Sequence, residues 1–568
     1  MTVVVGACAA GDEGGERLAG EPDGASGLAS AAGGVDVGVA SAANLLDDPA
    51  LEARLLSTVY DLAAFGEKRA GTPAGRAAGD YVAQRFAGAG LDDVAFESFS
   101  FNSFELHSSS LSFAKVFAYS GVGSIQNVEV VDVDEGRLED YVVPVTGKVV
   151  LVKSVQSFHR TSQFAIARQK GAVGMIASSN AAANLSQSGG VQAPELGLGS
   201  LLAVSIGAVD AGALRAALAA GQTVRTSLHV DASLEPRKGR NVVGWRRRPG
   251  SCPGDPYLLV GAHYDSWHAG SIDNGTGVAT MLEIAEATAG GAARDYDIAF
   301  VGYDAEEVGL LGGYDFMRRH LARNREPLSA FVHVDMTAIA KPEYMGGLVP
   351  RFFATTGNSP LGEIAGELDM GSLYQSVIGL DVVPAITGGL IPTDVQGLYW
   401  GGVDGSIAFS FTPFYHTERD TPDTVDTQFL ARNTLAMKAF LDQVDAEPPA
   451  SFTPKDPALF YAELNVDYLW LGPGVRVRVK VKDANGQPVK RPWVQMRLYV
   501  DDFTIPQGGQ SPSPGGPLQE TIGNDAGEAS FVVSPWHFWA GHGARWLHAR
   551  VGKEAERYPR GEQVRALP

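Results

Sequence analysis

Between residues 241 and 446, short apolar runs alternate with segments in which apolar residues recur at helical spacing. The runs are rich in β-branched and aromatic residues, which is typical of buried strands. They cover residues 241–245, 257–260, 297–303, 331–334 and 407–411. A helical segment over residues 429–444 follows the last run. Because strands and helices alternate, this region predicts an α/β fold with a mostly parallel sheet and helices on both faces.

A second pattern of strands and helices precedes this region. Its first group consists of two helical segments and a strand, at residues 49–65, 74–87 and 94–101. Its second group consists of three strands, at residues 147–153, 171–177 and 201–206, and a short helix at residues 164–170. The second group carries no cluster of catalytic residue types. We interpret it as an insertion that walls or caps an active site built elsewhere.

The periodicity changes after a linker at Pro448-Pro449. From Val475 to Val481, valines alternate with arginine and lysine residues, which predicts a strand with one buried face. Further strands are expected at residues 494–500, 529–533 and 546–551. The C-terminal region therefore predicts a small antiparallel β-sandwich.

These changes of pattern divide the chain into five expected parts. Residues 1–45 form a disordered tail or a signal and linker segment. The catalytic domain begins over residues 46–110, is interrupted by the insertion over residues 111–226, and continues over residues 227–447. The sandwich module covers residues 448–568.

Composition and charge narrow the classes of function. A chain of 568 residues is too long for one hydrophobic core. Its 45% hydrophobic and 19% charged residues are typical of a globular protein, and its sequence contains no apolar run long enough for a transmembrane helix. The formal net charge of −20 argues against a nucleic-acid partner, because phosphates would be repelled.

The N-terminus is similar to the end of a bacterial lipoprotein signal. Val5-Gly6-Ala7-Cys8 follows a short apolar segment and precedes a tract rich in Gly, Ala and Asp. By this interpretation Cys8 carries a lipid anchor, and the protein is exported to the cell envelope or secreted. No Lys or Arg precedes the apolar segment. A cytoplasmic protein with a disordered tail is therefore the alternative.

Candidate metal ligands follow several of the predicted strands. His263, Asp265 and Asp273 come after the strand at residues 257–260. Further imidazole and carboxylate groups follow three other strands, at Glu306, Glu307, Asp335 and His416. The carboxyl ends of strands in an α/β sheet meet at one edge, so these side chains are expected to converge. Zinc takes nitrogen and carboxylate-oxygen ligands, and the set therefore predicts a zinc site.

The order of these residues resembles the pattern of the zinc exopeptidase family M28, which is H-x-D, D-[ND]-x-x-G, E-E, D and H. The matching segments are His263-Tyr264-Asp265, Asp273-Asn274-Gly275-Thr276-Gly277, Glu306-Glu307, Asp335 and His416. The segments HYDSW and DAEEVGLLG are similar to the sequences of one branch of this family. That branch contains glutamate carboxypeptidase II, the transferrin receptor and related bacterial peptidases. The segments GKVVLV and GAVGMI are similar to sequence segments of a protease-associated domain. The resemblance implies the zinc exopeptidase fold with such a domain inserted.

The resemblance also implies how the ligands are shared. Asp273 would bridge two zinc ions, because a carboxylate offers two oxygens and one imidazole nitrogen cannot span both ions. His263 and Asp335 would complete the set around one ion. Glu307 and His416 would complete the set around the other. His268 and His333 have no counterpart in the pattern, and we interpret His333 as a core or pocket residue.

Three more residues are expected to act without binding zinc. Glu306 would take a proton from the attacking water and pass it to the leaving amine. Asp265 would orient the imidazole of His263. In the glutamate carboxypeptidase branch a tyrosine precedes the last histidine and stabilises the oxyanion, and Tyr415 would take that role.

The expected activity is hydrolysis of a peptide bond at a chain terminus. Residues 336–415 contain only two cations, Lys341 and Arg351, against seven carboxylates. This balance favours recognition of a terminal ammonium group, as in an aminopeptidase. Arg160 or Arg168 of the insertion could instead bind a terminal carboxylate. A glutamate-type carboxypeptidase or dipeptidase is therefore the first alternative.

Two other classes of protein are built on the same scaffold. A receptor-like protein that has lost its metals would lack ligands, and no ligand of the pattern is missing here. A zinc glutaminyl cyclase is disfavoured by the complete two-metal set. Some relatives form dimers, and the sequence leaves the oligomeric state open.

Overall fold

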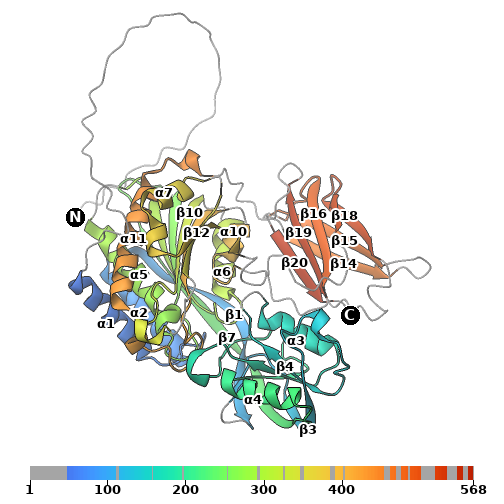
Figure 1. Ribbon diagram of the computed structural model, residues 1–568. Coiled ribbons are helices and arrows are strands. Elements are labelled where there is room, and N and C mark those ends of the chain that lie inside the picture. Colours follow the sequence, from blue (N-terminus) through green and yellow to red (C-terminus); the bar gives the residue numbers. More distant parts are fainter. Residues whose placement is uncertain are drawn as a thin grey trace, which may run out of the picture.

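The computed structural model contains an α/β body, a second α/β unit and a C-terminal pair of sheets (Figure 1). It describes residues 48–110, 114–155, 158–192, 194, 197–252, 254–290, 294–323, 327–345, 351–357, 359–380, 382–383, 391–400, 403–452, 461–468, 475–483, 486–499, 519–533, 546–553 and 561–566. The expected tail at residues 1–45, with Cys8, lies outside the described residues.

The body is built on a mixed sheet whose strands lie in the order β12-β11-β13-β10-β8-β9-β7. Their bounds are Arg225–Arg246 for β7, Tyr257–His263 for β8, Asp297–Tyr303 for β9, Leu328–Asp335 for β10, Arg351–Thr355 for β11, Ser376–Gly379 for β12 and Asp404–Ser410 for β13. β9, β8, β10 and β13 are parallel neighbours. β7 and β11 join them antiparallel on either side. The predicted mostly parallel sheet is therefore confirmed.

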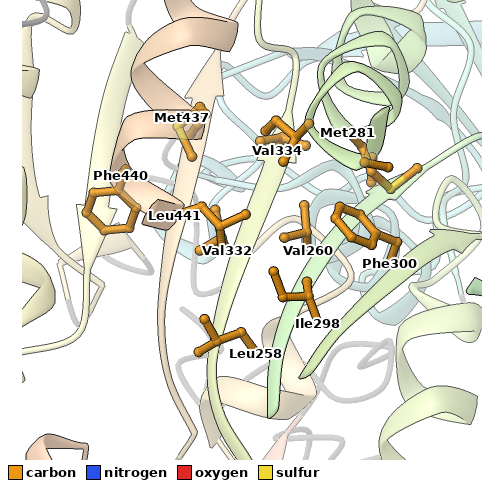
Figure 2. Packing of buried hydrophobic residues seen from close by; sticks show 14 of the residues in the cluster. Leu258, Val260, Met281, Ile298, Phe300, Val332, Val334, Met437, Phe440 and Leu441 are labelled. Carbon is orange, nitrogen blue, oxygen red and sulfur yellow. The ribbon is translucent and has the colours of Figure 1, made fainter. Parts of the chain in front are cut away.

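Helices cover both faces of this sheet. The larger helical layer contains α1 (Pro49–Ala63), α2 (Pro73–Gly88), α5 (Gly277–Ala287), α7 (Leu361–Glu367) and α11 (Thr427–Ala446). Strand residues such as Val260 and Val332 point into it and pack with Met281 of α5 and Phe440 of α11 (Figure 2). The opposite face is covered by α6 (Leu311–Phe316) and α10 (Gln396–Trp400), whose apolar side chains belong to a second buried cluster.

Phe440 offers a test of this packing. Its side chain is 0% exposed and lies 4.9 Å from the ring of Phe353. Phe440→Ala is expected to lower the free energy of unfolding by about 3–5 kcal/mol, because it removes buried apolar surface and leaves a cavity. Urea denaturation would measure the loss. The control Val209→Ala, at a position 69% exposed, should change stability by less than about 0.5 kcal/mol. An equal effect of the two changes would contradict this packing.

A two-stranded ribbon leads from the body into the second α/β unit. β1 (Asp92–Ser109) pairs antiparallel with β7 from the Asp92–Trp245 pair to the Ser109–Val230 pair. Both strands are longer than the apolar runs at 94–101 and 241–245 predict. The difference arises because the outer part of β1 carries polar residues and is largely exposed, so its sequence lacks the apolar signal of a buried strand.

The second unit has its own parallel strands. They are β3 (Gly123–Asp132), β4 (Val149–Lys153), β5 (Gly174–Ser178) and β6 (Leu202–Ile206). A short antiparallel strand, β2 (Lys115–Val116), borders β6, and the helices are α3 (Arg160–Gln169) and α4 (Ala208–Ala219). This unit lies in the segment that was expected to be an insertion, and the bounds 111–226 stay a prediction. Its identity as a protease-associated domain stays a prediction.

The C-terminal region contains two antiparallel sheets, as expected. One consists of β14 (Tyr461–Tyr468), β15 (Val475–Lys482) and β18 (Glu528–Val533). The other consists of β17 (Gln519–Ile522), β16 (Pro492–Tyr499), β19 (Trp546–Lys553) and β20 (Gly561–Ala566). Val477 and Val479 of the first sheet share a buried cluster with Val494 and Val551 of the second. Val477, Val479 and Val481 therefore lie on the inner face of a sandwich.

Candidate metal centre

The candidate ligands lie where neighbouring strands of the body end. β8 ends at His263 and β10 ends at Asp335. Glu306 and Glu307 follow β9, and His416 follows β13. These four strands are parallel neighbours, so their carboxyl ends open onto one edge of the sheet, where α/β folds bind ligands.

Asp273 stands between two groups of these side chains. It belongs to a buried turn, Ser271–Thr276, between β8 and α5. Its Oδ1 atom lies 3.4 Å from Nε2 of His263, which is 3.5 Å from Oδ1 of Asp335. Its Oδ2 atom lies 3.2 Å from Nε2 of His416, which is 2.9 Å from Oε2 of Glu307. Each carboxylate oxygen therefore faces one three-residue cluster of potential metal ligands.

The chemistry of both clusters fits a divalent cation such as zinc. Each offers one imidazole nitrogen and carboxylate oxygens, the donor set that zinc takes. Oδ1 of Asp335 and Nε2 of His416 are buried and have no hydrogen-bond partner among the described residues. Burial disfavours the charged form of Asp273, yet the two neighbouring imidazoles hold the pKa of its carboxyl well below the usual value. A charged carboxylate between two imidazoles is ready to bind cations.

The two imidazoles are oriented by main-chain carbonyl groups. Nδ1 of His263 lies 3.0 Å from the carbonyl oxygen of Asp265. Nδ1 of His416 lies 3.1 Å from the carbonyl oxygen of Ser188, a residue of the second α/β unit. A carbonyl is an acceptor, so it fixes the proton on Nδ1 and leaves Nε2 free to bind a metal.

Asp265 was expected to orient the imidazole of His263, and its carboxylate makes other contacts. Its carboxylate lies 3.6 Å from Nδ1 of His263, farther than its own carbonyl oxygen. The carboxylate instead accepts hydrogen bonds from the main-chain N–H groups of Glu306 and Glu307, at 3.0 and 3.3 Å. Asp265 therefore holds the two adjacent glutamates in place as well as the imidazole.

Glu306 and Tyr415 lie at the same site but outside both clusters. Burial and the charge of Glu307 raise the pKa of Glu306 well above its usual value, although His263 opposes the shift. Burial also raises the pKa of Tyr415 well above its usual value, so its hydroxyl stays protonated. A carboxyl that can exchange a proton and a phenol that can donate a hydrogen bond therefore lie beside the clusters.

Two functional candidates were missed by the sequence analysis. The carboxylate of Asp420 accepts hydrogen bonds from the main-chain N–H groups of Ile272 and Asp273, at 2.8 and 3.0 Å. Lys68 is 1% exposed and donates to the carbonyl oxygen of Ala269 at 2.5 Å. Burial lowers the pKa of Lys68 to about 8 and raises that of Asp420 to about 7. The only sequence signal for Asp420 is its place four residues after His416.

Asp420→Asn is expected to weaken metal binding by about 10- to 100-fold, the range for residues that orient ligands. Asparagine keeps one acceptor oxygen, so one of the two N–H groups that hold the Asp273 turn loses its partner. Competition with a chromophoric chelator would measure the change. Asp423→Asn is the matched control, because that exposed carboxylate accepts a hydrogen bond from the hydroxyl of Tyr60 at 2.7 Å. Equal affinities of the two variants would exclude this role.

The rival imidazoles lie outside both clusters. His333 is 0% exposed, bonds Thr393 through Nε2, and has a pKa well below the usual value because of burial. His268 lies 2.9 Å from Oγ of Ser188 through its Nε2 atom. Burial lowers the pKa of His268 to about 4. Both are therefore neutral side chains with structural contacts.

Comparisons with known sequences match part of the body to a family of peptidases. Residues 241–441 match the model of peptidase family M28. A glutamate carboxypeptidase 2 homolog of Caenorhabditis elegans is 35% identical over 122 residues, which cover 20% of this chain and only 15% of that protein. The probable lipoprotein aminopeptidase LpqL of Mycobacterium tuberculosis is 26% identical over 422 residues, which cover 66% of this chain and 81% of that protein.

Solved structures share the fold. The peptidase M28 precursor from Shewanella amazonensis superposes with a TM-score of 0.56 at 22% identity, over 72% of this chain and 98% of that one. BSAP, a zinc aminopeptidase from Bacillus subtilis, superposes with a TM-score of 0.53 at 19% identity, over 71% and 97%. The family match includes every residue of the two clusters. Over residues 241–441, which carry both clusters, this chain therefore matches peptidase family M28.

Proposed function

We propose that the protein is a di-zinc exopeptidase that removes residues from the N-terminus of peptides. The observation that carries the proposal is the position of Asp273, whose two oxygens face separate ligand clusters. One cluster would hold the first ion through His263 and Asp335. The other would hold the second ion through Glu307 and His416. A single structural metal would not need a carboxylate placed between two ligand sets.

The chain's own residues account for the remaining steps. Two zinc ions would polarise the scissile carbonyl and lower the pKa of a water molecule. Glu306 takes a proton from the attacking water and later passes it to the leaving amine. Tyr415 keeps its proton and donates a hydrogen bond to the oxyanion.

Removal of N-terminal residues is favoured by the charges around the site. Arg351, one of the two cations of the segment before His416, donates to the carbonyl oxygen of Leu373 and lies over the ring of Phe429. Asp394 of the same segment is 0% exposed, and its charge adds to the rise in the pKa of Glu306. The likeness to the aminopeptidase LpqL over 66% of the chain also supports this choice.

One observation favours a carboxypeptidase or dipeptidase as the second candidate. Arg160 begins α3 in the second α/β unit, and its Nε atom donates to the carbonyl oxygen of Gly190 at 2.7 Å. It lies near enough to Tyr415 to offset part of the burial-driven rise in the pKa of that hydroxyl. A guanidinium beside the reacting groups could bind the carboxylate of a C-terminal residue.

A substrate panel separates the two candidates. The purified protein would be offered aminoacyl-anilides and N-blocked dipeptides, each with and without a chelator. Hydrolysis of the anilides that stops with chelator and returns with zinc is the expected result. Arg160→Gln should leave this hydrolysis intact. Hydrolysis of blocked dipeptides alone, with a raised KM in Arg160→Gln, would establish the carboxypeptidase instead. No turnover of either class by protein holding two zinc ions would indicate a receptor-like protein.

We further propose export with a lipid on Cys8, supported by the likeness to the lipoprotein aminopeptidase LpqL. Among the described residues there is no helix long and apolar enough to cross a membrane. After expression in a bacterial host, the wild type is expected in the detergent phase of extracted membranes. Cys8→Ser should shift it to the aqueous phase. Equal distribution of both forms would argue against the anchor.

A further inference from the structure

A segment of the second α/β unit runs along the loop that carries His416. We call residues 182–190 the strap. The N–H group of Ala182 donates to the carbonyl oxygen of Pro413 at 2.8 Å. Nε2 of Gln187 donates to the carbonyl oxygen of Tyr415 at 3.1 Å. The strap therefore contacts this loop at several points before it reaches the histidine.

Ser188 holds His416 from two sides. Its N–H group donates to the carbonyl oxygen of His416 at 2.9 Å. Its own carbonyl oxygen lies 3.1 Å from Nδ1 of the imidazole. One residue thus fixes both the main chain and the ring of His416. The ring orientation decides where Nε2 points, and Nε2 is the atom that faces Asp273 and Glu307.

His416 needs such support because its backbone adopts an unfavourable conformation. Its φ angle is 58°, in the left-handed region that residues with a side chain rarely adopt. Residues in this region persist when the surrounding structure holds them there. The hydrogen bond that Ser188 donates and the one that it accepts supply that hold at the histidine itself.

The strap is in turn tied to the core of the second unit. The N–H group of Gln187 donates to Oγ of Ser205 in β6 at 3.1 Å. Oδ1 of Asn184 accepts from the N–H groups of Val209 and Asp210 in the first turn of α4, at 2.8 and 3.2 Å. The position of the strap therefore follows the position of the second α/β unit.

The other candidate ligand histidine is held by a carbonyl group of the body itself. Nδ1 of His263 bonds the carbonyl oxygen of Asp265, two residues later in the same loop of the body. The two metal positions therefore differ in their support, although they share Asp273.

We propose that the strap positions His416, so that the second α/β unit sets the metal affinity of the Glu307–His416 position but not that of the His263–Asp335 position. The inference rests on the proposed two-metal site. It makes Ser188 a positioning residue and gives the inserted unit a role in building the centre. Movement of this unit would loosen one metal and leave the other bound.

Ser188→Pro tests the proposal. Proline removes the N–H group that bonds His416 and restricts the strap. The full-length variant is expected to bind one zinc ion with wild-type affinity and the other about 10- to 100-fold more weakly. Titration against a chromophoric chelator and the metal content after dialysis would measure both. Ser188→Ala, which removes only the Oγ contact with His268, is expected to retain both ions.

Ala208→Pro is the matched control for adding a proline to the same unit. Ala208 is the exposed first residue of α4, a position that proline favours. This control should bind both ions as the wild type does. Equal binding by Ser188→Pro, or equal weakening of both ions, would overturn the inference. A wild type that binds fewer than two ions would instead refute the proposed function, so the two failures are distinguishable.

Hydrogen exchange of the wild type tests the proposal without a variant. Adding zinc should slow amide exchange in residues 182–190, although the strap supplies none of the proposed ligands. Residues 212–219, in the part of α4 beyond the amides that bond Asn184, should exchange at the same rate with and without zinc. Unchanged exchange in the strap of the zinc-loaded protein would overturn the inference even if Ser188→Pro fails to fold.

Discussion

Glu306→Gln is expected to lower kcat by about 10²- to 10⁴-fold, the contribution typical of a general acid–base group. Glutamine keeps the size of the side chain but cannot take a proton from the attacking water. Glu306 belongs to neither cluster, so the variant should keep the metal content of the wild type. Steady-state rates on the best anilide and the zinc content of the same sample would measure the two effects.

Glu343→Gln is the control for this change. Glu343 is an exposed glutamate in a short helical turn, Pro342–Tyr344, and its replacement should leave kcat unchanged. Turnover of Glu306→Gln close to that of the wild type would show that another group accepts the proton. Loss of zinc from Glu306→Gln would mean that this side chain is a ligand.

Asp273→Ala is expected to remove both metals, the largest change in metal content that one substitution can cause here. Each of its oxygens faces a different cluster, so both sites lose a ligand and the negative charge between them. His263→Ala and His416→Ala each alter one cluster and should each remove one metal. Zinc content after dialysis against a weak chelator would measure the difference.

Glu363→Ala controls for loss of a carboxylate elsewhere in the body. Glu363 is an exposed residue of α7, and its replacement should leave the zinc content unchanged. If Asp273→Ala lost only one metal, Asp273 would be a ligand of one site and not a bridge. If His416→Ala lost both metals, the two positions would be cooperative.

The layout of the body could be predicted because its strands are buried on both faces. Strands of this kind appear in a sequence as continuous apolar runs. β8, β9 and β10 are examples, because they are buried along their whole length. β12 was missed because Ser376–Gly379 is short and partly exposed. β13 begins at Asp404, earlier than the apolar run at 407–411, because polar residues such as Ser406 pair with β10.

The part of the candidate site that consists of ligand and catalytic side chains could be predicted. Histidine and carboxylate residues at strand ends are visible in the sequence, and so is their order. Ser188 was not predictable, because it contacts His416 through main-chain atoms that any residue except proline would supply. Asp420 was missed because a carboxylate that bonds main-chain N–H groups has no motif of its own.

X-ray diffraction from zinc-loaded crystals, measured above and below the zinc absorption edge, would test the two-metal centre most directly. The account predicts two anomalous peaks about 3.5–4 Å apart, the usual spacing in two-metal sites. One peak should lie among His263, Asp335 and Asp273. The other should lie among Glu307, His416 and Asp273. A single peak, or two peaks that do not share Asp273, would contradict the account.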